Sequence, residues 1–349
     1  MTSHCDTNNF NATLDTPRDT PKDMHIDAVI TWVNGSDEKH AAKLKQTLAD
    51  LGKAIPVSLQ GPRLIDVGEV KWCVDSILIN APWIRNIFII ADDQRPEFLD
   101  LPEYAQLTHK IKVVDHKEIF SGFEHALPSF NSRSIPMMLW KIHGISDRFI
   151  YFNDDFLIIK PVTAKDFFIN DKIVINGKWE NLYPTKTKLI IFLNKNLGIF
   201  KKKINNASHI KSVYLSSKPF GFKHRFVSLD HAPHPFLTSC YKFLFENHPE
   251  KMHHMINHKF RSNKQYSPEG LTVHYALEKN KAVFNSKKQS EMIKANHISF
   301  EAVQLKLNAI QQNPNSAYLC IQNLADADMK KQNYIRNWIE NDLNIKYKK

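Results

Sequence analysis

Two adjacent carboxylates interrupt a strongly apolar stretch of the chain, and their spacing suits phosphate chemistry. The apolar run 149–152 (FIYF) stops at Asn153-Asp154-Asp155, and a second apolar run, 156–159, follows at once. Carboxylates this close repel each other and raise each other's pKa, and a divalent cation relieves that repulsion. Mg²⁺ and Mn²⁺ prefer such oxygen ligands together with substrate phosphates. Asp154 and Asp155 are therefore candidate metal ligands. The alternative is a polar turn between two strands.

The sequence has no glycine-rich loop that could cradle a phosphate group. Neither GxxxxGK(S/T) nor GxGxxG occurs, and the 349 residues include only 10 glycines. This excludes a P-loop, a dinucleotide-binding fingerprint and a kinase-type glycine loop. A nucleotide would therefore be held by a metal ion, by basic side chains and by the ends of strands, as in nucleotide-sugar enzymes built on an open α/β sheet.

The elements around these residues alternate between strands and helices. Strands are expected over 26–33, 86–92, 110–115 and 148–153, and helices over 37–51, 67–79 and 134–143. This alternation predicts an α/β fold with a largely parallel sheet. Acidic residues follow three of the strands, at Asp92-Asp93, Asp115 and Asp154-Asp155. Ligands bind at the carboxyl ends of such strands, so the acidic residues are expected at one edge of the sheet.

The rest of the chain sets the expected domain organisation. Residues 1–24 are polar and contain two prolines, which predicts a flexible leader. Residues 25–349 are expected to form one domain with three parts: an α/β core over 25–170, a variable insert over 171–227 and a largely helical part over 228–349. Within the last part, helices are expected over 236–260, 268–280, 299–312 and 328–342.

Composition and charge favour a cytoplasmic protein with anionic ligands. The formal net charge is +11, and the four cysteines are scattered, which fits a reducing compartment. No apolar segment reaches the ~18 residues that a membrane span needs. The chain carries no nucleic-acid-binding motif, so nucleic acid is not expected as a partner. The run Lys201-Lys202-Lys203 leaves peripheral contact with the inner membrane open.

Several sequence words, in one fixed order, resemble the Stealth family. They are TWVNG (31–35), APWI (81–84), VDHKEIF (114–120), FNS (130–132), YFNDD (151–155), HAPHP (231–235) and FRS (260–262). The resemblance is nearly continuous over 26–170 and partial over 228–280, and CIQNLAD (320–326) is a weak fourth block.

The resemblance implies a fold and an activity. Stealth proteins are phosphotransferases of the sugar-1-phosphate type. Bacterial members look like capsular polysaccharide phosphotransferases, and the animal relative makes the mannose-6-phosphate lysosomal tag. For this chain it implies a catalytic domain with a Rossmann-like, GT-A-type nucleotide-sugar-binding core. It also implies transfer of a hexose-1-phosphate, such as an N-acetylhexosamine-1-phosphate, from a UDP-sugar to a hydroxyl of an oligo- or polysaccharide. This reaction would release UMP and form a phosphodiester. The resemblance also leaves contact with the capsule export machinery open.

Three residues in the resembling motifs are expected to be catalytic. His231 is the candidate general base, because a neutral imidazole suits that role near neutral pH. His234 in the same motif is its rival. Arg261 is expected to stabilise the transferring phosphoryl oxygens, since its planar fork matches phosphate geometry. Asp154 is expected to act with Asp155 in holding Mg²⁺ or Mn²⁺ on the diphosphate.

Further residues match or neighbour motif positions and are expected to contact the donor. They are Asp27, Trp32, Asn34, Gly35, Glu69, Asp92, Gln94, Asn131, Ser132 and Arg133. The chain departs from the family pattern at two places. Pro136 stands where relatives usually carry Glu, and Gln322-Asn323 stands where Asn-Asp is expected. If the second position binds metal, Asp326 or Asp328 could replace it.

Two other functions stay open on the sequence alone. A metal-dependent GT-A glycosyltransferase would use the same fold but move only the sugar, and it would release UDP instead of UMP. A non-catalytic polyanion-binding protein would use the basic surface, and its binding would survive loss of His231 and Asp154 but collapse with salt.

Overall fold

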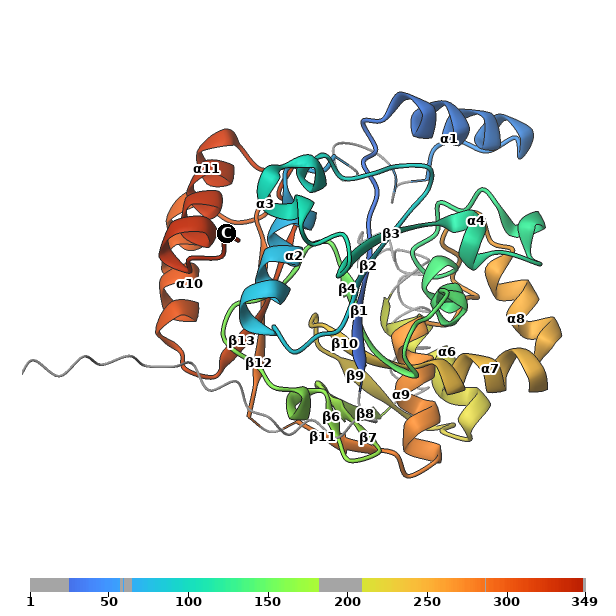
Figure 1. Cartoon of the computed structure of the whole chain (residues 1–349). Helices are drawn as coiled ribbons and strands as arrows, with labels where there is room; N and C mark the ends of the chain where they lie inside the picture. Colours follow the sequence, from blue (N-terminus) through green and yellow to red (C-terminus); the bar gives the residue numbers. More distant parts are fainter. Residues whose placement is uncertain (1–24, 57–58, 60–64, 182–208, 286, 348–349) are drawn as a thin grey trace, which may run out of the picture.

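The computed structural model describes residues 25–56, 59, 65–181, 209–285 and 287–347 (Figure 1). The expected leader over 1–24 lies outside the described residues, as does the part of the expected insert that carries Lys201-Lys202-Lys203. Within the described part of the chain, no helix is long and apolar enough to cross a membrane.

The centre of the molecule is a five-stranded sheet. Its strands, in spatial order, are β10 (His234–Leu237), β4 (Arg148–Asn153), β1 (Ile26–Thr31), β2 (Ile87–Ala91) and β3 (Ile111–Asp115). The last four pair in parallel, and β10 pairs antiparallel to β4. All residues of β2 are buried, as is typical of a parallel strand covered on both faces. The α/β fold with a largely parallel sheet is confirmed.

Helices and short turns connect the strands of this sheet. They are α1 (Glu38–Asp50), α2 (Glu69–Asn80), α3 (Pro102–Ala105) and α4 (His116–Ile119), and the 3-10 helices η3 (Glu97–Asp100), η4 (Glu124–Ala126) and η5 (Ile135–Lys141). The helices expected over 37–51 and 67–79 are confirmed. The segment expected over 134–143 forms a 3-10 helix with Pro136 in its first turn.

A second sheet begins directly after the Asp154-Asp155 pair. It consists of β12 (Gln289–Lys294), β13 (Ser316–Gln322) and β5 (Phe156–Ile158), in that order. Figure 1 shows α10 (Phe300–Gln312) and α11 (Met329–Asn337) beside this sheet, and the π-helix η8 (Trp338–Asp342) follows α11. The two carboxylates therefore occupy the corner at which the chain leaves one sheet and enters another.

The remaining elements form smaller units beside the central sheet. The strands are β6 (Phe168–Ile169), β7 (Lys172–Ile175) and β11 (Ala282–Phe284) in one sheet, and β8 (Gly177–Asn181) and β9 (Arg225–Leu229) in another. The helices are α6 (His209–Ser217), α7 (Thr238–Asn247), α8 (Pro249–Ile256) and α9 (Pro268–Glu278), with the 3-10 helices η6 (Ala164–Asp166) and η7 (Lys218–Phe220).

The largely helical part expected over 228–349 needs a correction. Its four expected helical segments are present as α7 with α8, α9, α10, and α11 with η8. However, the strands β10, β11, β12 and β13 also belong to it, and β10 joins the central sheet. The buried apolar side chains of both larger sheets form one continuous core. The boundaries of the three expected parts stay a prediction.

Candidate active site

A pocket of about 570 Å³ opens at the carboxyl ends of the parallel strands, the edge where ligands are expected. Among the site residues that the sequence predicted, the pocket is lined by Trp32, Glu69, Asp92, Asn131, Ser132, Asp154, Asp155 and Arg261. The other predicted site residues do not line the pocket: Asp27, Asn34, Gly35, Gln94, Arg133 and His231. The structure thus gathers most of the motif residues into one cavity.

The Asp154-Asp155 pair lies in the tight turn between β4 and β5. Burial raises the pKa of Asp155 to about 6. Burial, and then the negative charges of Asp155 and Glu69, raise the pKa of Asp154 well above its ordinary value. One oxygen of Asp155, Oδ2, accepts a hydrogen bond from the Cys320 thiol at 3.5 Å. The other, Oδ1, is buried and has no hydrogen-bond partner among the described residues.

Two further carboxylates stand beside this pair at the start of α2. Burial raises the pKa of Glu69 to about 7. A hydrogen bond from the backbone of Val67 opposes this rise, and the negative charge of Asp66 adds to it. Asp66 accepts from the backbone N–H groups of Gly68 and Glu69 at 2.8 and 3.0 Å and from Trp32 Nε1 at 2.9 Å. Sequence reasoning missed Asp66, although an Asp just before a helix is a common signal of capping.

These four carboxylates fit a divalent cation. One buried Asp155 oxygen has no hydrogen-bond partner among the described residues, and three of these acids have raised pKa values. A hard cation would bind such oxygens and reduce the repulsion between the carboxylates. Among the described side chains, no group of three His, Cys, Asp or Glu residues is placed to hold a metal ion by itself. A cation here would therefore take further ligands from water and from substrate phosphates, which Mg²⁺ commonly does.

Arg261 forms part of the wall of the pocket. Its Nε donates to Ser132 Oγ at 2.6 Å. Burial lowers the pKa of Arg261, while Tyr151, Glu269 and Asp155 favour its charged form. Because a guanidinium keeps its charge even so, Arg261 brings a fixed cation close to the buried carboxylates.

Two motifs far apart in the sequence are bonded together behind this wall. Asn131 Nδ2 donates to the carbonyl of His258 at 2.7 Å and to Gln265 Oε1 at 3.0 Å. Arg133 donates to the carbonyl of Ser262 at 2.8 Å. Asn131 touches the pocket and Arg133 does not. Both are buried, so their main effect is to position Ser132 and Arg261.

His231 is half-buried in the loop between β9 and β10. Its ring centroid lies 5.9 Å from that of His209. Burial lowers the pKa of His231, and His209 and Lys294 lower it further. Lys294 lines the pocket, whereas His231 does not. A neutral imidazole at pH 7 is the form that a general base requires.

The rival His234 lies within β10 and is buried. Burial lowers its pKa to about 4. Glu269, in the first turn of α9, is a carboxylate that sequence reasoning missed. Burial pushes its pKa upward, but His209 and His234, together with hydrogen bonds from the Ser267 hydroxyl and from the backbone, outweigh burial, and the net pKa is lowered. Glu269 therefore stays ionised among these histidines.

Asp27 is not brought to the pocket. It begins the β1 ladder, at the end of the strand opposite to the cavity, and its side chain is fully buried. Its carboxylate accepts from Arg85 Nε at 2.8 Å and from the backbone N–H groups of Asn86 and Ser146 at 3.1 and 2.8 Å. We therefore assign Asp27 a structural role in place of the expected contact with the donor.

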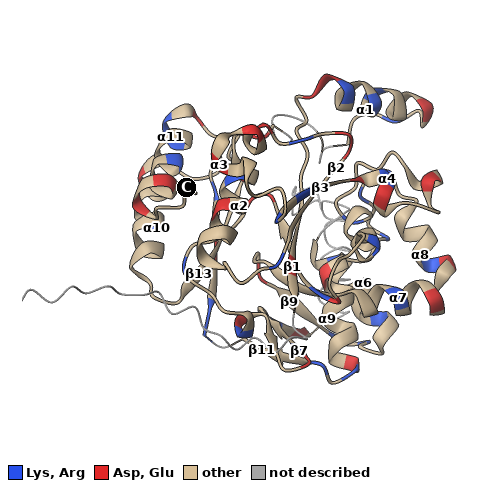
Figure 2. Cartoon of the chain, in the orientation of Figure 1, with Lys and Arg blue, Asp and Glu red and all other residues tan. Residues whose placement is uncertain are grey.

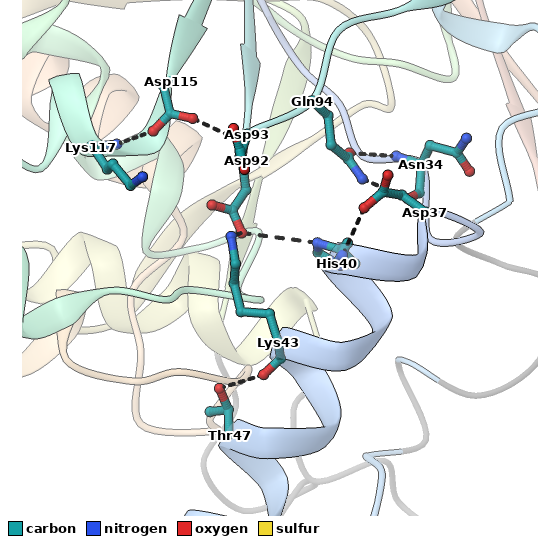
Figure 3. A network of polar contacts seen from close by, with 10 residues as sticks. All are labelled: Asn34, Asp37, His40, Lys43, Thr47, Asp92, Asp93, Gln94, Asp115 and Lys117. Atoms are coloured by element: carbon teal, nitrogen blue, oxygen red, sulfur yellow. Dashed lines mark hydrogen bonds and ion pairs between the residues drawn. The ribbon is translucent and has the colours of Figure 1, made fainter.

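Asn34 and Gln94 hold two loops together instead of lining the cavity. Gln94 Oε1 accepts from the Asn34 backbone N–H at 3.0 Å, and Gln94 Nε2 donates to the Asn34 carbonyl at 2.8 Å (Figure 3). Gly35 lies in the same turn. This clamp joins the loop after β1 to the loop after β2.

The two positions that depart from the family pattern differ in their placement. Pro136 is buried in η5. Gln322 and Asn323 line the pocket, and Asn323 places an amide where the family pattern has a carboxylate. Asp328 caps α11 by accepting from the Lys331 backbone N–H at 2.9 Å. Neither Asp326 nor Asp328 lines the pocket, so the structure gives no support to either as a replacement ligand.

Comparisons with known proteins agree with the motifs. The model of Stealth protein CR1, conserved region 1, matches residues 24–52, and that of Stealth protein CR2, conserved region 2, matches residues 63–175. "Exopolysaccharide phosphotransferase SCO2592" of Streptomyces coelicolor is 33% identical over 65% of this chain and 22% of its own. "Capsular polysaccharide phosphotransferase cps1A" of Actinobacillus pleuropneumoniae is 39% identical over 43% of this chain and 40% of its own.

"Capsular polysaccharide phosphotransferase SacB" of Neisseria meningitidis serogroup A is 29% identical over 83% of this chain and 49% of its own. This chain thus spans from about a fifth to about half of the length of these relatives. Among solved structures, one of LgtC aligns with a TM-score of 0.41 at 10% identity, over 89% of this chain and 94% of that one.

Proposed function

Because this chain belongs to the Stealth family, we propose that it is a sugar-phosphate transferase of capsular or exopolysaccharide biosynthesis. It moves a hexose-1-phosphate from a UDP-sugar to a hydroxyl of a saccharide acceptor, forms a phosphodiester and releases UMP. We infer an N-acetylhexosamine-1-phosphate as the transferred group, a GT-A-type core as the donor-binding unit, and a cytoplasmic location that allows contact with the inner membrane.

The observation that carries this proposal is the pairing of opposite charges in one pocket. Asp154, Asp155 and Glu69 line this pocket together with Arg261, at the carboxyl edge of a parallel sheet. A diphosphate needs both a cation and a donor of strong hydrogen bonds, and this arrangement offers positions for each. A purely structural turn would not leave a buried Asp155 oxygen unpaired beside a cavity.

The residues can divide the reaction among themselves. The acceptor hydroxyl oxygen forms a bond to the phosphorus that carries the sugar, and the bond from that phosphorus to the bridging oxygen breaks. UMP leaves with the bonding electrons, and His231 takes the proton of the hydroxyl. Arg261 donates to the phosphoryl oxygens, whose negative charge it stabilises. Ser132 fixes the direction of the Arg261 fork through the bond to its Nε.

A divalent cation, Mg²⁺ or Mn²⁺, belongs to the proposal. Asp154 and Asp155 would hold it, and Glu69 and Asp66 stand close enough to contribute charge. When bound, it would neutralise the diphosphate and the leaving group.

One measurement separates the proposed reaction from its alternatives. The purified protein is incubated with a panel of UDP-sugars, Mg²⁺ and phosphate-linked oligosaccharides, and UMP is resolved from UDP. We expect UMP with one of the donors. Release of UDP would instead identify a glycosyltransferase.

A polyanion-binding protein would release neither nucleotide. Figure 2 shows both acidic and basic positions along α1.

A further inference from the structure

The pocket continues past the carboxylates to a second set of polar side chains, which the proposed reaction does not use. These are His40, Asp92, His116 and Ser129, together with the ring of Phe130, and all five line the cavity. We call this group the imidazole corner. It lies over the ends of β2 and β3, whereas Asp154 and Asp155 lie at the end of β4.

Two capped helices fix the imidazoles in place. Asp37 caps α1 by accepting from the His40 backbone N–H at 2.7 Å (Figure 3). Asp115 caps α4 with a capping box shared with Glu118, and His116 is the first residue of that helix. Each imidazole therefore sits in the first turn of the helix that comes next along the chain after a parallel strand, near the strand ends that commonly bind ligands.

The polar atoms of the imidazole corner are incompletely satisfied. His40, His116 and Ser129 are only 6%, 5% and 2% exposed. His40 Nδ1, His116 Nδ1 and Ser129 Oγ have no hydrogen-bond partner among the described residues. His40 Nδ1 lies 4.0 Å from Asp92 Oδ2, which is too far for a hydrogen bond. Buried groups of this kind are normally paired, so three orphans beside one cavity indicate a missing partner.

The charge of the imidazole corner differs from that of the carboxylate end. Asp92 is neutralised by Lys43, whose Nζ lies 2.8 Å from Oδ2 (Figure 3). Burial lowers the pKa of His40, and lowers that of His116 to about 4, so both rings are neutral at pH 7. The corner is thus close to uncharged, whereas the other end holds Asp66, Glu69, Asp154 and Asp155.

The distance between the two ends suits an elongated ligand. The strand order is β4, β1, β2, β3, and neighbouring strands lie about 4.8 Å apart, so the ends of β4 and β3 are separated by roughly 14 Å. A nucleoside diphosphate is elongated, charged at the phosphate end and uncharged at the other. We propose that the imidazole corner binds the nucleoside of the donor while the carboxylate end binds its metal-bound diphosphate.

This inference rests on the proposed function and refines it. Phe130 offers an apolar ring beside the imidazoles: its centroid lies 5.3 Å from that of His40, and its other neighbour is Phe260 at 5.7 Å. His40, His116 and Ser129 supply hydrogen bonds to hydroxyl, carbonyl or amide groups of the nucleoside. The donor contacts expected of Asn34 and Gly35 are thereby assigned to residues that line the cavity.

The experiment compares binding of UDP and of inorganic pyrophosphate, each with Mg²⁺, by titration calorimetry. The first variant is Ser129→Ala. Removing a buried hydroxyl that has no protein partner should not lower the melting temperature. If the nucleoside is the partner, the same change should weaken UDP binding about threefold to tenfold, the value of one ordinary hydrogen bond, and leave pyrophosphate binding unchanged.

Two more variants complete the comparison. His116→Gln keeps a polar side chain and should weaken UDP binding by a similar factor, again without effect on pyrophosphate. Ser316→Ala is the matched control, because Ser316 is also buried but lies outside the pocket, and UDP binding should not change.

Three results would count against the inference or the function, and they can be told apart. If Ser129→Ala and His116→Gln bind UDP as the wild type does, or lose UDP and pyrophosphate equally, the nucleoside assignment is wrong. If the wild type binds UDP and the variants bind UDP more weakly, but no UMP is released from any UDP-sugar, the nucleoside assignment stands and the proposed function is wrong. If the wild type does not bind UDP, both are wrong.

Discussion

At the scale of single residues, His231 carries the proposed proton transfer. Because a positioned base contributes about 10²- to 10⁴-fold to a rate, His231→Ala should lower kcat at least about 100-fold. Circular dichroism and the melting temperature should stay close to those of the wild type. His224→Ala is the matched control, since His224 is exposed in the preceding loop. If His231→Ala unfolds the chain as it loses activity, the residue is structural.

The buried carboxylates predict a pH dependence of stability for the metal-free protein. The pKa values of Asp155 and Glu69 are raised to about 6 and about 7, above their unfolded values near 4. For these two groups the folded state binds more protons than the unfolded state between these limits, so their contribution to stability falls as pH rises through that window. Buried histidines such as His116 and His234, whose pKa values are lowered to about 4, contribute in the opposite sense below about pH 6.5. The contribution of the carboxylates is therefore measured in EDTA as the difference in melting temperature between the wild type and variants that lack one carboxylate.

Two variants test this contribution. As pH rises from 5 to 8, the melting temperatures of Asp155→Asn and Glu69→Gln should each rise relative to that of the wild type, because each variant removes one titrating carboxyl group. The melting temperature of Asp100→Asn should follow that of the wild type, since the Asp100 side chain is 74% exposed. A difference from the wild type that does not change with pH in both pocket variants would show that these carboxylates titrate normally in the folded protein.

The sequence predicted some of these residues and not others, for physical reasons. Asp154 and Asp155 could be placed because they directly follow a recognisable strand. Asp27 could have been set aside, since it opens a predicted strand while ligands bind where parallel strands end. His40, Ser129 and Glu269 could not be placed, because only long-range packing brings them to the pocket or to His231.

At the scale of elements, the ion pair of Asp27 with Arg85 secures the amino-terminal end of β1. The Asp27 side chain is fully buried, and breaking a buried pair costs about 3–5 kcal/mol. Asp27→Asn, which keeps some hydrogen bonds, should lower the free energy of unfolding in urea by about 2–3 kcal/mol. The KM for the donor should not change. A raised KM with unchanged stability would restore Asp27 as a binding residue.

The strands of the α/β core were predictable because buried parallel strands are continuous apolar runs. β10 was not, since it contains Pro235, which usually argues against a strand. An edge strand tolerates proline, and β10 lies at the edge of the central sheet. β13 contains an apolar run of five residues, 317–321 (AYLCI), that could have been recognised. Its pairing with β5, which creates the corner at Asp154-Asp155, depends on long-range contacts that no local pattern reveals.

At the scale of the whole molecule, the donor nucleotide and the cation should stabilise the fold together. A ligand that binds only the folded state raises its stability by RT ln(1 + [L]/Kd). Since the cation would bridge protein and diphosphate, UDP with Mg²⁺ should raise the melting temperature by more than the sum of the two separate shifts. The surplus should vanish in Asp155→Asn. Additive shifts in the wild type would argue against a shared site.

The central claim is that phosphorus moves with the sugar, and an isotope follows that directly. A UDP-sugar labelled with ³²P only at the phosphate next to the sugar is incubated with the protein, Mg²⁺ and a phosphate-linked oligosaccharide. The account predicts label in the oligosaccharide, unlabelled UMP as the second product, and no transfer by His231→Ala. Label that remains in released UDP while the acceptor gains an unlabelled sugar would contradict it.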